Sequence, residues 1–334
     1  MKGHASWTAA LARGLASVLV AGGVVWMRSP IVGASSAPTA PSTDYQVTSS
    51  WGDTVSFNGQ PVLYAYQEGY EATPGSPSGD SVIILDFFRQ VMQTNNGVTS
   101  WGVDIGSTGF EPDSWVEEVA TAFINGYSDG HSSSAAASIA IGTANDNYNW
   151  TCDESTGNVS SNWASAGADW GNVLLSLPSS PNNVVLVTSA DDFESWIGTF
   201  SDGWTACGLG AEDWLNAFQN TVDPSGGAVN VNYGTDANAE DSSQWTSGEV
   251  YDVSFTGDAQ AMPEVYCSGQ PSEWADVSTG TYVSFWGVTS ENGAYFGSGC
   301  NGNTSTDTYT WSEAWNALES VLTTQSLYPA VDDY

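Results

Sequence analysis

The chain has 334 residues, of which 41% are hydrophobic and 12% aromatic, so it can build a large core and is not a disordered chain. It carries 38 Asp and Glu against only 4 Lys and Arg, which gives a formal net charge of −34. Phosphate groups are bound by clustered Lys and Arg, so we expect neither nucleic acid nor an anionic membrane surface as a partner.

The scarcity of basic side chains indicates the medium in which the protein works. Lys2, Arg13 and Arg28 lie at the N-terminus, and only Arg89 follows them. All charged residues together make up 13%, so bases have been lost rather than acids added. Near about pH 3 most carboxylates are neutral, and each base would be an unpaired, repelling charge. We therefore favour an acidic medium over a high-salt medium, which also selects acidic proteins.

The N-terminus has the composition of a secretory signal peptide. Lys2 and Arg13 form a basic region, and residues 14–27 form an apolar stretch that is short for a membrane span. The alternative is an uncleaved N-terminal anchor. Cleavage would leave a secreted or cell-surface protein with no stable membrane insertion. We predict a signal peptide over residues 1–37, a linker and N-terminal extension over 38–78, and one barrel domain over 79–334.

Short apolar runs alternate with amphipathic segments along this domain, which is typical of an α/β protein. Strands are predicted at 81–87, 100–105, 138–142, 184–189, 228–233, 250–255, 263–267 and 282–288. Helices are predicted at 115–127, after a capping-box pattern of Ser114 and Glu117, and at 164–177, 211–222, 272–277 and 311–322. This pattern fits a single (β/α)8 TIM-like barrel with irregular elements. An open doubly wound α/β sheet is the alternative.

The cysteines suggest disulfides, and the histidines limit the catalytic chemistry. Cys152, Cys207, Cys267 and Cys300 form an even set without a C-x-x-C motif, so we expect two disulfides whose pairing stays open. The sequence has no histidine cluster for a zinc ion, and His131 is expected in a solvated loop. We predict no cofactor and no metal centre.

Carboxylates follow several of the predicted strands. In a barrel the active site lies at the carboxyl ends of the strands. The densest group is Asp191, Asp192 and Glu194, directly after the run 184–189. In extended backbone Asp192 and Glu194 share a face, and two carboxylates held close together acquire different pKa values, as an acid/base pair needs. The alternatives are a solvated loop, a helix cap or a weak calcium site.

Such carboxylates predict glycoside hydrolysis, in which one carboxyl group protonates the leaving oxygen and another acts as nucleophile or base. Carboxyl groups still titrate in an acidic medium, where histidine stays charged. Aromatic residues near these segments would either stack on sugar rings or pack in the core. They are Trp150, Trp196, Trp245, Tyr266 and Trp286.

Several of these segments, in the same order, resemble a family of secreted bacterial proteins that is frequent in actinobacteria and has a glycoside-hydrolase-like barrel. They are VIILDF (82–87), IAIGTAND (139–146), ADDFESW (190–196), VNYG (231–234) and AMPEVY (261–266). In that family the segments read approximately LDFG, IGTNN, DDIE, VSWG and PEIY. The resemblance covers about residues 80–320. It implies a shared cleft lined by Asp86, Asn145, Asp191, Asp192, Glu194 and Glu264.

The chain departs from this family pattern at two positions. Phe88 stands where the family has glycine, and Tyr233 stands where it has tryptophan. On the predicted strand count, Glu194 follows strand four and Glu264 belongs to strand seven. This placement is similar to that of the two catalytic glutamates in the large barrel glycosidase clan. That clan has an asparagine before its acid/base, whereas this chain has Phe193.

We therefore expect an exported protein that hydrolyses or binds an extracellular or cell-wall polysaccharide. Glu194 is the expected general acid/base, Glu264 the nucleophile or second carboxylate, and Asp192 the residue that tunes Glu194. The expected substrate-binding residues are Asp86, Asn145, Asp191, Trp196, Tyr266 and Trp286. The alternative is a catalytically inactive carbohydrate-binding or envelope protein on the same scaffold.

Overall fold

The computed structural model describes most of the predicted domain. The described residues are 49–50, 61–72, 81–105, 109–132, 137–144, 150–153, 155–178, 185–193, 198–199, 205–225, 227–234, 245–266, 268–278, 284–290, 309–322, 326–327 and 331–333. All of them belong to one structural unit, Thr39–Tyr334. The predicted signal peptide lies outside the described residues.

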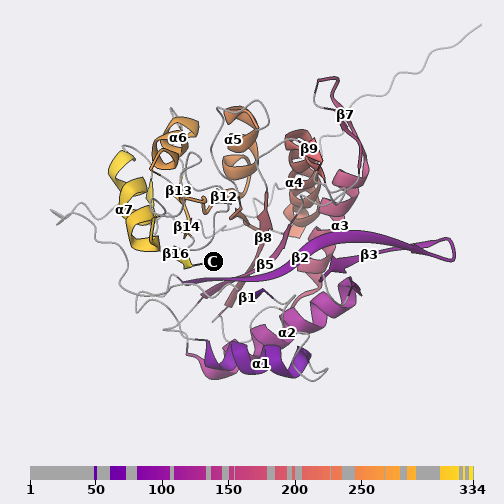
Figure 1. Cartoon of the computed structure of the whole chain (residues 1–334). Helices are drawn as coiled ribbons and strands as arrows, with labels where there is room; N and C mark the ends of the chain where they lie inside the picture. The colour runs from indigo at the N-terminus through magenta and orange to yellow at the C-terminus, as the bar shows by residue number, and fades with distance from the viewer. Residues whose placement is uncertain are drawn as a thin grey trace, which may run out of the picture. The chain divides into compact units, whose positions relative to one another are not determined.

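The fold is built on a sheet whose parallel strands follow one another in chain order (Figure 1). These strands are β1 (Ser49–Ser50), β2 (Ser81–Asn95), β5 (Ala137–Ala144), β8 (Val185–Asp192), β11 (Asn230–Asn232), β12 (Ala259–Ala261), β13 (Ser284–Phe285) and β15 (Ser326–Leu327). A parallel neighbour can be reached only by a crossover connection, which is usually a helix. The predicted α/β class with a mostly parallel sheet is confirmed.

In the described residues, one helix lies in each connection between consecutive parallel strands. The helices are α1 (Pro61–Glu71), α2 (Asp113–Gly130), α3 (Asn162–Ser176), α4 (Gly208–Val222), α5 (Ser247–Phe255), α6 (Gln270–Val277) and α7 (Trp311–Val321). Shorter elements decorate this frame: β3 (Val98–Asp104), β4 (Phe110–Pro112), β6 (Cys152–Asp153), β7 (Asn158–Val159), β9 (Gly198–Thr199), β10 (Thr205–Ala206), η4 (Asp223–Ser225), β14 (Val288–Ser290) and β16 (Val331–Asp333). None of the helices in the described part of the chain is long and apolar enough to cross a membrane.

The two faces of the sheet bury different side chains. Alternate residues such as Ile83, Leu85 and Ile139 join the helices in one large apolar core. The residues between them face the other way, because side chains alternate along a strand. There a separate buried cluster consists, among the described residues, of strand and strand-end side chains only: Ile84, Ala140, Ala190, Val231, Tyr233 and Met262. We call this side the strand-only face.

The helices pack in pairs through glycines that allow close backbone approach. A Cβ atom on Gly126 of α2 would overlap the carbonyl group of Tyr66 in α1. A Cβ atom on Gly167 of α3 would overlap the carbonyl group of Trp214 in α4. Glycine at these positions lowers helix propensity but brings the two backbones together. The α1–α2 and α3–α4 contacts therefore depend on the absence of a side chain.

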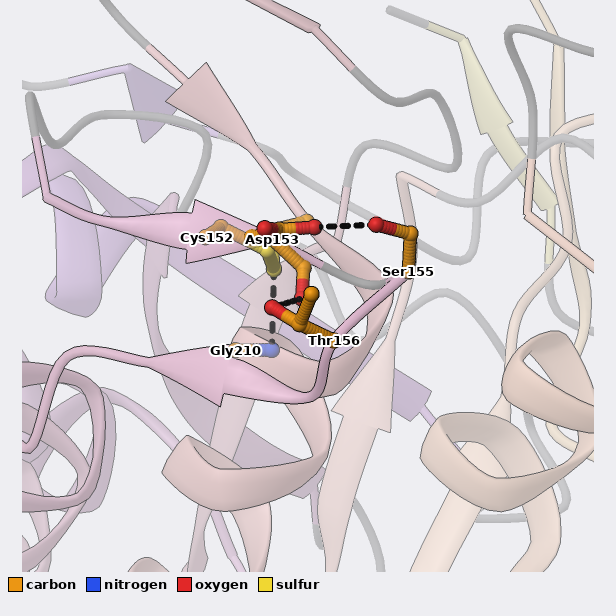
Figure 2. The surroundings of a disulfide bond; sticks show 6 residues. Cys152, Asp153, Ser155, Thr156 and Gly210 are labelled. Carbon is orange, nitrogen blue, oxygen red and sulfur yellow. Dashed lines mark hydrogen bonds between the residues drawn. A yellow bond between two sulfur atoms is a disulfide. The ribbon is translucent and has the colours of Figure 1, made fainter.

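A disulfide joins the connections that follow β5 and β8. Cys152 lies in β6, after β5, and Cys207 is the N-cap of α4, after β8. Figure 2 shows this bond, with the Cys207 sulfur accepting a hydrogen bond from the Gly210 amide at 3.2 Å. The cysteines are 55 residues apart, and closing such a loop stabilises the fold by about 4 kcal/mol in the chain-entropy model. The other two cysteines, Cys267 and Cys300, lie outside the described residues.

Three predicted strands are wrong. Residues 250–255 form the end of α5, because Thr246 and Glu249 make reciprocal capping-box hydrogen bonds that start a helix. Residues 100–104 belong to β3, which returns antiparallel to β2 after a two-residue turn and is not one of the parallel strands. The strand predicted at 263–267 does not form; the parallel strand in this part of the chain is β12, which ends earlier, at Ala261.

Two local predictions also need correction. The N-cap of α2 is Pro112 rather than Ser114, so the predicted capping box does not form. His131 is half-buried at the end of α2, where its ring stacks on Tyr127, and it is not a solvated loop residue. The segment predicted as linker and N-terminal extension contributes β1, which pairs with β2, and α1, which packs on α2.

Candidate functional site

The strand-only face carries a row of four side chains at the carboxyl ends of β8, β11, β12 and β13. The parallel register places Asp191, Asn232, Ala261 and Phe285 side by side. The next residue of each strand turns to the opposite face. Main-chain hydrogen bonds continue the ladder there, from Met262 N–H to Asn232 O and from Trp286 N–H to Ala261 O. We call these four residues the end row: Asp192, Tyr233, Met262 and Trp286.

Asp192 is the carboxylate of the end row, and it is half-buried. Its carboxylate lies against Gly234, where any Cβ atom would overlap Asp192 Oδ1. A side chain at Gly234 would therefore displace the carboxylate. This contact gives the Tyr233-Gly234 pair of the sequence motif a physical role, because the glycine makes room for the acid on the neighbouring strand.

Asp86 lies one layer deeper on the same face, because its register partners are Gly142 in β5 and Ser50 in β1. Its carboxylate Oδ1 accepts a hydrogen bond of 2.7 Å from the Phe88 amide. The Thr143 hydroxyl donates to the Phe88 carbonyl at 2.8 Å. The β2–β5 register shifts between Asp86 and Arg89, so this turn is a bulge that holds the Asp86 side chain in place.

Phe88 adopts a left-handed backbone conformation with φ of 60°. An aromatic residue with this φ is strained, and such strain is often found at functional sites. Glycine adopts positive φ without cost, and the predicted family resemblance has glycine at this position. An aromatic residue therefore occupies a backbone conformation that favours glycine.

Phe88→Gly and Phe88→Val should separate the cost of this strain from the loss of the ring. Both variants remove the aromatic side chain, but valine is disfavoured at positive φ and glycine is not. We expect the glycine variant to be more stable than the valine variant by about 1–2 kcal/mol. Urea unfolding of the two proteins measures this difference. Equal stabilities would show that the left-handed conformation is not populated in solution.

Tyr233 belongs to this site but is not among the predicted site residues; in the sequence it stands out only as a departure from the family pattern. Its ring is buried in the strand-only cluster, next to Ala190 and Val231. The hydroxyl group reaches over β8 to β5, because a Cβ atom on Gly142 would lie 3.3 Å from it and 3.4 Å from the Asp86 Cα. Tyr233 therefore connects the end row with the deeper carboxylate. Tyr233 lies two residues after Val231, so the alternation of side chains along the strand could have placed it on the strand-only face.

Glu264 follows β12 and lies two residues after Met262. Val265 belongs to the helix-side core and Met262 to the strand-only cluster, and Glu264 lies between them in the segment that follows β12. Glu264 is half-buried, and Trp286 of the end row is half-buried as well. Asp86, Asp192 and Trp286 are thus the predicted site residues that the structure brings to one face, and Glu264 follows the end row by two residues.

Two predicted substrate-binding residues do not join them. Asp191 is fully buried and shares its row with Asn232, whose amide donates to Ser254 of α5 at 2.8 Å, so Asp191 faces the helices. Tyr266 is 4% exposed, and its main chain bonds to Gln270 and Tyr309. Neither side chain is placed to meet a substrate at this face. Asn145, Glu194 and Trp196 lie outside the described residues.

The other aromatic candidates serve packing. Trp245 is 1% exposed and belongs to the helix-side core. Trp150 meets Trp101 and Trp163 edge to face, with ring centroids 5.9 Å and 5.3 Å apart. Trp150 therefore packs in an aromatic cluster beside the disulfide. Among the candidates described by the structure, Trp286 is the one left for stacking at the end row.

A pair of carboxyl groups with raised pKa values lies away from this face and joins α2 to α3. Burial raises the pKa of Asp169 to about 8, and the Asp113 carboxylate adds to the shift. Burial also raises the pKa of Asp113 to about 6, although its hydrogen bond with Asp169 acts in the opposite direction. Two carboxyl groups can share a hydrogen bond only when one is protonated. Within the described residues, no group of three or more His, Cys, Asp or Glu side chains is placed to hold a metal ion.

Buried Gln90 of β2 ties this pair to the helices. Its amide nitrogen donates to Asp169 at 3.3 Å and to the Ala166 carbonyl at 2.9 Å. Its amide oxygen accepts from the Trp214 indole at 3.0 Å. The pair therefore forms part of the contact between β2, α3 and α4.

No protein-family model, curated protein or solved structure matches the chain. The family resemblance in the sequence motifs therefore stays a prediction.

Proposed function

We propose that the protein is an exported, carbohydrate-active protein that works in an acidic medium and hydrolyses a polysaccharide at the carboxyl ends of its parallel strands. The observation that carries this proposal is the placement of Asp86 and Asp192 on one face, beside Tyr233 and Trp286, with Glu264 two residues after Met262 of the end row. Paired carboxyl groups next to an aromatic surface are what glycoside hydrolysis needs. The disulfide agrees with export to an oxidising compartment.

The proposal includes closure of the sheet into a (β/α)8 barrel. An open doubly wound sheet reverses its strand order, whereas here eight parallel strands follow chain order with a helix in each connection. Right-handed crossovers that advance in one direction put every helix on the same face. The strand-only face is nevertheless buried, as a barrel interior would be. Closure requires β15 to pair with β1.

Three carboxyl groups share the proposed chemistry. Glu194 is the general acid/base on sequence grounds, and it follows Asp192 by two residues. Glu264 is the nucleophile or second carboxylate, and Asp192 tunes Glu194 through its negative charge. Carboxyl groups retain this function in acid, where they exchange protons within the working pH range. Asp86 and Trp286 bind the sugar.

Turnover of soluble glycans provides the test. Release of reducing ends from a panel of bacterial, plant and fungal polysaccharides should be measured near about pH 3–4 for the wild type and for three variants, Glu194→Gln, Glu264→Gln and Asp192→Asn. We expect the glutamate variants to lose at least about 100-fold in rate, because a general acid or base contributes that much. Glycan binding should stay within about threefold, because an amide is nearly isosteric with the carboxyl group.

Glu118→Gln is the matched control, because Glu118 is an exposed carboxylate on α2, on the helix side. It should leave the rate unchanged. Wild-type protein that binds glycans without turnover, with binding insensitive to these substitutions, would replace the hydrolase by the inactive carbohydrate-binding protein.

A further inference from the structure

β2 and β3 continue beyond the sheet as a projecting hairpin (Figure 1). Residues 92–100 are all exposed, and the chain turns at Asn96 and Gly97, whose φ angles of 52° and 79° fit a two-residue hairpin turn. β5 pairs with β2 only as far as Arg89, and β4 pairs with β3 only from Gly102. In the described part of the chain, both outer edges of the hairpin between these points are without a strand partner. We call residues 90–103 the arm.

The main-chain groups on each outer edge follow from the register. Asn95 and Val98 flank the two-residue turn, so they exchange both of their hydrogen bonds with each other. Such pairs alternate with pairs whose amide and carbonyl groups point outward. The amide and carbonyl groups of Met92 and Thr94 therefore point to the outer edge of β2. The amide and carbonyl groups of Thr99 point to the outer edge of β3.

The arm carries no charge. Residues 90–103 contain no Asp, Glu, Lys or Arg, in a chain with 38 acidic residues. Exposed edge strands are normally protected from pairing by charged side chains or proline, and the arm has neither. Two copies of this acidic chain repel each other, and an uncharged projection is where they can approach without bringing carboxylates together. Met92 and Val98 add exposed apolar surface there.

We propose that the arm pairs with the arm of a second copy of the chain, through antiparallel addition of β2 to β2. The outward groups fix the register, because Met92 of one copy must exchange hydrogen bonds with Thr94 of the other, and the reverse. A two-fold axis then passes between the two Gln93 side chains. The same edge meets itself, as a closed symmetric dimer requires. The β2 edge is chosen because β4 already covers the β3 edge from Gly102.

The test compares two pairs of matched variants by sedimentation equilibrium over a range of protein concentrations. Thr94→Pro removes an outward amide from the β2 edge, and Thr99→Pro removes one from the β3 edge, without breaking a hydrogen bond between the two strands. Both variants lose the same hydroxyl contact, since Thr94 and Thr99 bond to each other at 3.1 Å. We expect Thr94→Pro to weaken the dimer at least about tenfold and Thr99→Pro to leave it intact.

Gln93→Glu and Ser100→Glu form the second pair and do not alter the backbone. Gln93 and Ser100 are cross-strand partners, so each substitution adds one charge to the same place on the arm. The first puts two like charges directly opposite each other at the two-fold axis. We expect it to abolish the dimer at pH 7 and to restore it near about pH 3, where the new carboxyl groups are neutral.

Ser100→Glu should dimerise like the wild type at both pH values. A wild type that is monomeric at all concentrations would overturn the proposal and leave the arm for a different partner. Equal behaviour of the two variants within either pair would also overturn it, because the interface would then lie elsewhere.

Discussion

Replacing Gly167 by alanine is expected to destabilise the fold by about 3 kcal/mol or more. The new Cβ atom would overlap the Trp214 carbonyl oxygen and would lie 2.6 Å from its carbon, and backbone atoms cannot rotate away. α3 and α4 must then separate. Trp214 packs against Phe193 and bonds to Gln90, so the separation would disturb the contact that holds β2 and the start of the loop after β8. Urea unfolding gives the change in free energy.

Gly248→Ala is the control for this prediction. Gly248 is an exposed glycine in α5, and the nearest atom to an added Cβ is 3.6 Å away. Alanine in a helix ordinarily stabilises by about 0.4–1 kcal/mol relative to glycine, so this variant should gain stability. The two substitutions are chemically identical and are expected to have opposite signs. Neutral behaviour of Gly167→Ala would mean that the helices tolerate a wider spacing than the structure shows.

The free energy of unfolding is expected to fall as the pH rises from about 5 to 9. The pKa values of Asp113 and Asp169 are raised in the folded protein to about 6 and about 8, above the ordinary value near 4. A raised pKa stabilises the fold fully below the unfolded value, and this contribution is lost as the pH passes through the folded values. After a discount for solvent screening, we expect a loss on the order of 3 kcal/mol.

Asp169→Asn separates this pair from the general repulsion of an acidic protein. The asparagine amide can donate to the Asp113 carboxylate without a proton, so the variant should be more stable than the wild type near pH 8 and similar near pH 4. Asp213→Asn makes the same substitution at an exposed side chain on α4, and it should change the pH profile little. Parallel pH profiles for the wild type and Asp169→Asn would contradict a shared proton.

The hydrophobic pattern predicted those strands and helices whose apolar side chains are buried in the core. The predicted strands at 81–87 and 138–142 lie within β2 and β5, the predicted strand at 184–189 overlaps β8 from Val185, and the predicted helix at 211–222 lies within α4. Pattern failed at 250–255, where two valines three residues apart fit a helix face, since Val250, Val253 and Ser254 are the buried residues of α5. The Thr246–Glu249 capping box was the deciding signal. It lies before the segment, and the strand interpretation ignored it.

The arm shows a second kind of failure. Residues 100–105 have the composition of a buried strand, but Asn96 and Gly97 form a tight turn that returns the chain antiparallel to β2. The turn dipeptide was present in the sequence as a hairpin signal. Reading this run and residues 250–255 as parallel strands still gave a barrel count of eight, because β1 and β15 were not predicted.

The candidate site was predictable where it depends on alternation along one strand. Asp86 and Asp192 follow strand patterns that are readable from sequence, and both lie on the strand-only face. The opposite orientation of Asp191 follows from the same alternation. The bulge at Phe88 and the reach of the Tyr233 hydroxyl depend on contacts between strands, which a single sequence does not contain.

The single Lys or Arg among residues 29–334 has a consequence for proteolysis. Proteases of the trypsin type cut only after Lys or Arg, and beyond residue 28 the chain offers them Arg89 alone. That residue lies in β2 with Asp104 of β3 on one side and Ala144 of β5 on the other. A protease must draw several residues of its substrate into an extended, unpaired strand, and here both edges are occupied. Beyond residue 28 the chain therefore offers such enzymes one bond, and the residue before that bond is paired on both edges.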